Sequence, residues 1–237
     1  MSSSSTVMTP SSSKYSSAFW ERLWLMSGIG FIAFFVIAYL IYGFQPQVGA
    51  QPDAVISFYD GNRVRILIAV ALAGPTVLNL MWFVAALRTA LADAGQDGWG
   101  AAATTAGAMV GGLFLLTLAI VASLSYSIAG TNGIAAVSSL NDLAWSFVVL
   151  SSFPRAMLIM SGTFGLWRAG LISNALFATG VVAVVLVLLG GTTWINGGLW
   201  APDGLYSRFV TPLIGLTWII VVTRVLLGRK AVSRTAW

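Results

Sequence analysis

The stretch WSFVVLSSFPRAMLIMSG, residues 145–162, is apolar apart from its hydroxyl groups and a single charge, Arg155. A run of this length with at most one charge is typical of a helix that crosses a lipid bilayer. Pro154 does not argue against a membrane helix, because neighbouring helices satisfy the backbone groups that proline frees. The stretch therefore predicts a membrane helix that carries a buried arginine.

The composition of the whole chain agrees with this interpretation. Of its 237 residues 58% are apolar and only 8% are charged, and the mean hydropathy is +0.89. Soluble domains carry about 25% charged residues, so this chain has too few charges to build a water-soluble surface. The net charge of +5 is scattered over the loops, which does not favour nucleic-acid binding. We predict an integral membrane protein.

The sequence contains neither cysteine nor histidine. Disulfides, thiolate chemistry and iron–sulfur ligation by the chain are thereby excluded, as are imidazole ligation and a histidine base. P-loop, dinucleotide-binding and HExxH patterns are also missing from the sequence. We expect no cofactor, no metal site and no enzymatic activity.

Six stretches have the length needed to cross roughly 30 Å of hydrocarbon. The predicted fold is all-α, one transmembrane domain over residues 19–230, between a disordered Ser-rich tail (1–18) and a short carboxy-terminal tail (231–237). The expected spans are about 22–43, 65–87, 100–126, 141–162, 171–190 and 209–228.

The positive-inside rule gives the predicted orientation, because basic residues gather in cytoplasmic loops. With the amino terminus inside, the outer loops are 44–64, 127–140 and 191–208, and the outer side, which includes the start of the second span, holds only Arg63, Arg65 and Arg208. Both termini are then cytoplasmic. The inner side holds the larger basic set: Lys14, Arg22, Arg88, Arg168, Arg224, Arg229, Lys230 and Arg234.

Counting depth along the spans predicts a polar layer around Arg155. If the fourth span begins at Asn141, Arg155 lies about 21 Å into it, in the inner third of the bilayer. Asn79 reaches the same depth on the second span and shares a face with Thr76, and Asn174 lies near this level on the fifth. These four side chains are the candidate ligand layer.

Three interpretations of Arg155 are open on the sequence alone. An unpaired arginine at the bilayer centre costs roughly 3 kcal/mol, so the side chain needs either water or acceptors. It snorkels to the cytoplasmic headgroups, or it bonds across helices, or it holds an anionic ligand or lipid headgroup. For cross-helix bonding we expect Asn79, Asn174 or the carbonyl of Leu150 as acceptors, since Pro154 cannot donate to that carbonyl.

Four charged residues stand at the outer entrances to two spans: Asp60, Arg63, Arg65 and Asp142. They form either an ion-pair cluster at the rim of a cavity or docking surface, or a set of solvated charges that fix helix ends.

The third span carries small residues at four-residue spacing, Ala103, Gly107 and Gly111. Such a face lets two helices approach closely. It predicts tight packing inside the bundle, with dimerisation through the same face as the alternative.

Three segments together resemble a broad family of uncharacterised multi-pass bacterial membrane proteins. They are FYDGNRVRILIAVALAG (58–74), LMWFVAALRTAL (80–91) and LNDLAWSFVVLSSFPRAMLI (140–159). The resemblance covers roughly residues 20–228, with FY-x-x-x-R and LND entrances to the second and fourth spans. It implies a six-helix bundle in a bacterial plasma membrane and brings no catalytic residues.

No predicted span carries an Asp or Glu at mid-membrane depth, where ion-coupled transporters usually place one. We therefore expect a non-enzymatic membrane protein, either an accessory subunit of a larger complex or a binder of a lipid or apolar ligand between its helices. The alternative is a permease or channel for a small solute. The expected partners are membrane lipids and a protein partner or second copy in the membrane.

Overall fold

The computed structural model describes residues 23–128 and 134–234, and in this part of the chain every regular element is helical. The predicted tail 1–18 and residues 235–237 lie outside it. The elements are α2 (Ser27–Tyr42), α3 (Pro52–Gly61), α4 (Arg63–Asp93), α5 (Asp97–Ser123), η1 (Leu124–Ile128), α6 (Ile134–Leu150), α7 (Ser152–Arg168), α8 (Asn174–Gly190), η2 (Tyr206–Val210) and α9 (Thr211–Arg234).

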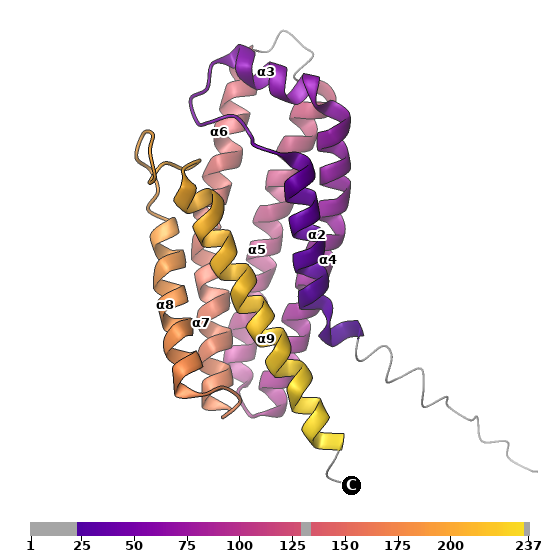
Figure 1. Cartoon of the computed structure of the whole chain (residues 1–237), viewed down its shortest axis with the longest axis vertical. Coiled ribbons are helices and arrows are strands. Elements are labelled where there is room, and N and C mark those ends of the chain that lie inside the picture. Colours follow the sequence, from indigo (N-terminus) through magenta and orange to yellow (C-terminus); the bar gives the residue numbers. More distant parts are fainter. Residues whose placement is uncertain (1–22, 129–133, 235–237) are drawn as a thin grey trace, which may run out of the picture.

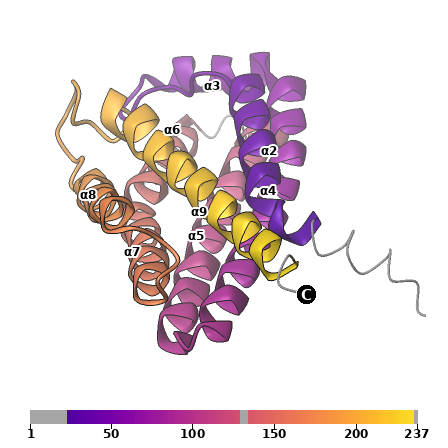
Figure 2. The same ribbon diagram turned by 60° about the horizontal axis from the view of Figure 1, so that its bottom comes forward.

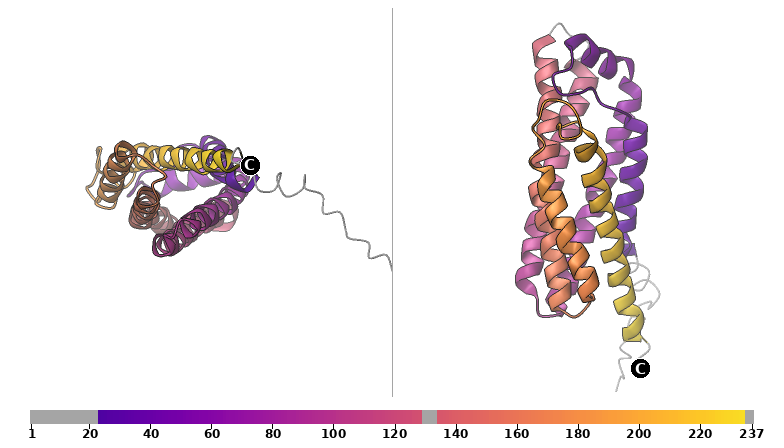
Figure 3. Two further views of the ribbon diagram at one scale, coloured as in Figure 1. Left: turned by 90° about the horizontal axis from the view of Figure 1, so that it is seen from below. Right: turned by 60° about the vertical axis from the view of Figure 1, so that its left-hand side comes forward.

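The helices form one elongated bundle. In Figure 1 the long helices run along the bundle axis, and α3 lies across one end. The beginning of α2 and the end of α9 lie at the opposite end, which we call the terminal end; Figure 3 agrees. α9 crosses the bundle diagonally, from beside α8 near the α3 end to beside α2 at the terminal end (Figure 2).

Four helical stretches of the described chain are long and apolar enough to cross a membrane: Arg63–Asp93, Asp97–Tyr126, Ala136–Arg168 and Tyr206–Gly228. α2 and α8 are apolar but have only 16 and 17 residues. At 1.5 Å per residue α8 covers about 26 Å, somewhat less than a typical hydrocarbon core. The structure thus gives an all-helical bundle with four candidate membrane spans in the described chain, and a count of six stays a prediction.

The helix that contains Arg155 is longer than predicted. Instead of 141–162, it runs from Ala136 to Arg168 through the junction of α6 and α7. Arg155 therefore lies about 20 Å from the Arg168 end and about 28 Å from the Ala136 end. The predicted helix end at residue 162 is thereby corrected to Arg168, so that Arg155 lies thirteen residues from this end of its helix, whereas its depth in the membrane stays a prediction.

α4 is the central helix of the core. Its residues Leu80, Phe83, Leu87 and Leu91 are almost fully buried, and helices α2 and α5 flank it on the two sides. Leu87 also contacts the α7 glycine Gly162 closely. Burial of this apolar stripe holds the bundle around α4.

The small residues of α5 pack on α4. Ala103 is fully buried, and a Cβ on Gly107 would lie 2.6 Å from a methyl group of Val84. A Cβ on Gly111 would lie 3.6 Å from Val77, so the two backbones approach closely along this face. Since α4 already covers the face, dimerisation through it is excluded in this arrangement.

Candidate functional site

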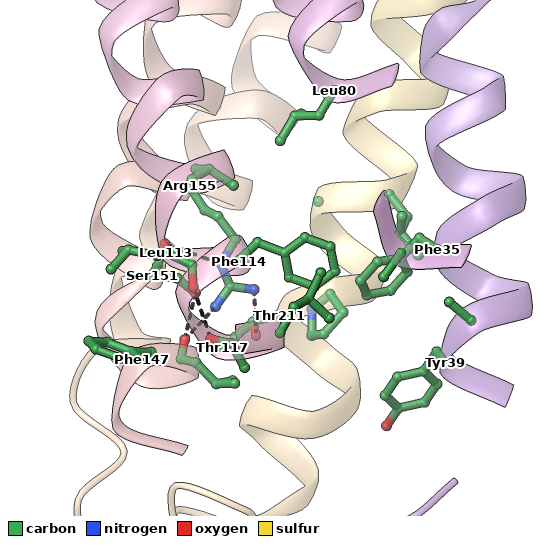
Figure 4. Close-up of a pocket in the computed structure, with 18 of the residues that line it drawn as sticks. Phe35, Tyr39, Leu80, Leu113, Phe114, Thr117, Phe147, Ser151, Arg155 and Thr211 are labelled. Atoms are coloured by element: carbon green, nitrogen blue, oxygen red, sulfur yellow. Dashed lines mark hydrogen bonds between the residues drawn. The ribbon is translucent and has the colours of Figure 1, made fainter. Parts of the chain in front are cut away.

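An elongated cavity of about 270 Å³ lies inside the bundle, between α2, α4, α5, the α6–α7 helix and α9. Its walls are mostly apolar and aromatic, with Phe31, Phe35, Leu80, Phe114 and Trp218 among the lining side chains. Figure 4 shows Arg155 at one wall and Phe35 and Tyr39 at the opposite wall. The cavity is therefore an apolar space with a cation at its edge.

The crossing of α2 and α9 explains why space remains between these two helices. Near the terminal end Gly28 of α2 lies directly against Thr223 and Ile219 of α9. Toward the α3 end the helices diverge, and aromatic rings bridge them. The ring centroids of Tyr39 and Phe209 are 6.5 Å apart, in an edge-on arrangement. The cavity occupies the space between these two contact points.

Arg155 turns into the bundle and is held by neutral acceptors. Its Nε donates to the carbonyl of Ser151 (3.2 Å), and its Nη2 donates to the carbonyl of Val148 (3.2 Å) and the hydroxyl of Ser152 (3.0 Å). Its Nη1 donates to the hydroxyl of Thr211 on α9 (3.3 Å). Arg155 thus links the α6–α7 junction to α9.

The direction of this side chain argues against snorkelling. Helical side chains lean toward the amino-terminal end of their own helix, and Arg155 reaches back seven residues to Val148. The guanidinium therefore points away from the Arg168 end of the helix. Snorkelling to headgroups at that end is the wrong interpretation, and bonding across helices is the arrangement found.

The predicted acceptors of Arg155 were wrong, because other groups take those roles. Asn79 donates to the carbonyl of Pro75 (2.8 Å), and its side-chain oxygen lies against Gly30 of α2. Asn174 accepts a hydrogen bond from the indole of Trp167 (2.8 Å). The Leu150 carbonyl is likewise not among the four acceptors.

Thr76 also bonds within its own helix, to the carbonyl of Leu72 (3.4 Å). Of the four residues of the predicted layer, Arg155 lines the cavity, whereas the other three have their hydrogen bonds elsewhere. The structure does not assemble them into one polar layer.

A second arginine, Arg208, also lines the cavity and was counted from the sequence only as an outer-loop charge. It lies in the π-helical segment η2, which leads into α9. Its Nη2 donates to the carbonyl of Gln45 (3.2 Å), and its guanidinium carbon lies 5.4 Å and 5.0 Å from the ring centroids of Phe44 and Trp145. Its Nε is buried and has no hydrogen-bond partner among the residues that the structure describes.

The four outer-rim residues do not come together as an ion-pair cluster. Arg63 donates to the carbonyl of Tyr126 (2.7 Å) and lies over that ring, while Asp142 accepts from the backbone N–H of Gly49 (3.1 Å). The guanidinium of Arg65 lies beside Gly43, and Asp60 is exposed. In the described chain Arg63 and Asp142 each bind a separate backbone segment, and no ion pair joins the four residues.

A buried polar network closes the α3 end of the bundle next to Arg208. Asn141, which is fully buried, accepts from Gln45 (3.0 Å) and Tyr59 (3.4 Å) and donates to the carbonyl of Gln47 (3.2 Å). The indole of Trp145 donates to the carbonyl of Pro46 (2.9 Å). The loop after α2 is thereby pinned to α6 above the cavity.

Tyr59, on α3 outside the spans, gives this network a pH dependence. Burial disfavours its phenolate and raises its pKa from 10 to about 12, against a smaller lowering by the hydrogen bond with Tyr42. The folded state thus keeps a proton that the unfolded state loses above pH 10. We expect the stability that this proton supports to be complete below pH 10 and to be lost as the pH rises toward 12.

Unfolding measured between pH 9 and pH 12 tests this expectation. Tyr59→Phe is expected to flatten the fall in stability, whereas Tyr126→Phe, which alters an exposed tyrosine, is expected to leave it unchanged. Equal slopes for the wild type and Tyr59→Phe would contradict the assignment.

The groups that line the site are two arginine side chains, several hydroxyls and many apolar side chains. The described residues hold no group of three or more side chains that could bind a metal. Comparisons of the chain with protein-family models, curated proteins and solved structures find no match.

Proposed function

We propose that the chain is a multi-pass protein of a bacterial plasma membrane that holds an apolar ligand, the hydrocarbon chain of a lipid, between its helices. The proposal includes six spans, cytoplasmic termini and no enzymatic activity. Four long apolar helices support the membrane location. Arg88, Arg168 and Arg224 lie in the helix parts that approach the terminal end, which supports a cytoplasmic position for that end.

The cavity is the observation that carries this proposal. An apolar cavity offers water too few polar partners and stays dry, whereas hydrocarbon fills it without loss of hydrogen bonds. In a bilayer the hydrocarbon at hand is the lipid chain. Aromatic side chains such as Phe35 and Phe114 line the space, which favours an apolar occupant over a hydrated solute.

A cavity-filling substitution tests the proposal. Gly215 lines the cavity, and a Cβ there would meet no atom within 4 Å, so a side chain can begin at this position and extend into the open space. We expect Gly215→Leu to weaken binding of a neutral fluorescent apolar probe about tenfold, since it takes the volume that the ligand needs. Gly112→Leu is the matched control, because Gly112 is an exposed helical glycine with equally open surroundings outside the cavity.

Equal probe binding by the wild type, Gly215→Leu and Gly112→Leu would contradict the proposal. If the wild type carries a solute into liposomes and Gly215→Leu blocks this flux, the permease function would be favoured instead. The accessory-subunit role, with a protein partner or a second copy in the membrane, stays a prediction that co-purification in mild detergent tests.

A further inference from the structure

We propose that the ligand of the cavity is an anionic amphiphile with one hydrocarbon chain, and that Arg208 binds its carboxylate or phosphate headgroup. The inference rests on the proposed function and adds the chemical class of the ligand. It is carried by the free donors of Arg208, their surroundings and their place at one end of an elongated apolar cavity.

Arg208 has more donors than partners. A guanidinium presents five N–H groups, and the contacts of Arg208 in the described chain use one of them, toward the Gln45 carbonyl. The Nε has no partner among the described residues, but it has almost no accessible surface and is not the group that a ligand would reach. Three N–H groups on Nη1 and Nη2 are also without a partner in the described chain, and since Arg208 lines the cavity, these are the donors that an acceptor of a ligand would meet.

The groups around Arg208 are neutral. Its charge is met by a carbonyl oxygen and by the faces of Phe44 and Trp145, both within 5.4 Å of the guanidinium carbon. Asp142, one turn before Trp145 on α6, accepts instead from the backbone N–H of Gly49. Arg208 is half-buried and has no carboxylate partner among the described residues, and a ligand anion that binds in bidentate fashion would supply one.

Arg155 strengthens the positive field at the same part of the cavity. It donates to the hydroxyl of Thr211, which lies one helical turn beyond Arg208. Its hydrogen bonds already go to four protein acceptors, so it contributes charge rather than free donors. Arg208 is therefore the contact residue and Arg155 an electrostatic neighbour.

The lining of the cavity extends along two helices over a length that suits a hydrocarbon chain. Along α9 its lining runs from Arg208 to Ile219, and along α2 from Tyr42 to Phe31, a length of roughly 16 Å. Arg208 lies at the end capped by the Asn141 network, and the far end is apolar. An amphiphile fits with its acid group at Arg208 and its chain along α2 and α9.

The test compares the binding of ligands that have different headgroups on hydrocarbon chains of equal length. The full-length protein in nanodiscs of neutral phosphatidylcholine is titrated at pH 8 with a long-chain fatty acid, an alkyl phosphate and a fatty alcohol of equal chain length, each displacing the neutral fluorescent probe. We expect the two anions to bind the wild type about tenfold more tightly than the alcohol. Equal binding of acid and alcohol by the wild type would overturn the inference without need of any variant.

Arg208→Gln is expected to remove the preference for the anions and to leave alcohol binding unchanged, whereas Arg208→Lys keeps part of it. Arg63→Gln is the matched control, because Arg63 also pairs with a carbonyl and an aromatic ring but lies outside the cavity lining. A preference that survives Arg208→Gln would overturn the inference.

Two further outcomes distinguish related explanations. If inorganic phosphate or acetate displaces the probe as well as the alkyl phosphate does, the site binds a free anion. This result would overturn the inference that the ligand is an amphiphile. A second outcome is that the alcohol binds strongly, that Gly215→Leu abolishes this binding, and that the acid binds no better than the alcohol. This result would support the proposed function and would overturn only the inference about the headgroup.

Discussion

Gly162→Val is expected to lower the free energy of unfolding by about 3 kcal/mol, since overpacking a tight core contact costs this much. A Cβ at Gly162 would lie 2.5 Å and 2.8 Å from two ring carbons of Trp218 and 3.2 Å from Leu87. Trp218 cannot move aside easily, because its indole donates to Thr163 (3.0 Å) and its ring meets Phe83 edge-on. The clash separates α7 from α9.

Unfolding of the detergent-solubilised protein measures this effect. Gly112→Val serves as the control, because a Cβ on Gly112 meets no atom within 4 Å, and we expect a change within about 0.5 kcal/mol. A Gly162→Val protein as stable as the wild type would contradict the close packing of α7 on α9.

Arg155→Lys is expected to destabilise the protein more than Arg155→Met, by about 3 kcal/mol against about 1 kcal/mol. Lysine keeps the cost of burying a charge, but its three donors on a single nitrogen cannot reach all four acceptors of the guanidinium. Methionine gives up the four bonds and also removes the buried charge.

Two of the acceptors that methionine would leave behind have other partners. The Val148 carbonyl also accepts from the Ser151 hydroxyl (2.7 Å), and Thr211 also donates to the Ser207 carbonyl (3.2 Å). Thermal and denaturant unfolding of both variants in the same detergent gives the order of stabilities. A methionine variant less stable than the lysine variant would contradict a central, buried Arg155 held by neutral groups.

The long helices could be predicted from the sequence because apolar length is a property of the chain alone. Residues 65–87 and 100–126 were expected, and the structure has Arg63–Asp93 and Asp97–Tyr126. The predicted spans differ from the observed helices at their ends, because the helices continue past the apolar run. Residues 136–140 and 163–168 belong to the helix of Arg155 although they were assigned outside the span.

α3 was assigned to an outer loop, yet its sequence carried a usable signal. Pro52 stands at the first turn with Asp53 beside it, and Val55 and Tyr59 are four residues apart, as on one helical face. Both of these apolar residues are buried in the structure. A helix this short, with polar residues between its buried positions, is not detected by the length of an apolar run.

The contacts of the arginines could not be predicted, because they depend on how helices rotate and tilt in the bundle. Depth counting placed Asn79 level with Arg155, but Asn79 faces Gly30 on α2. Arg208 meets Gln45 and Trp145, which lie far from it in the sequence, and it lies in a π-helical turn that no hydropathy pattern indicates.

Mass spectrometry of the protein under non-denaturing conditions tests the central claim most directly. The claim is that a lipid chain occupies the cavity between α2 and α9. We expect wild-type protein purified in mild detergent to retain one lipid-sized adduct per chain, and Gly215→Leu, but not Gly112→Leu, to lose it. A wild-type protein free of lipid, or an adduct that Gly215→Leu retains in full, would contradict the account.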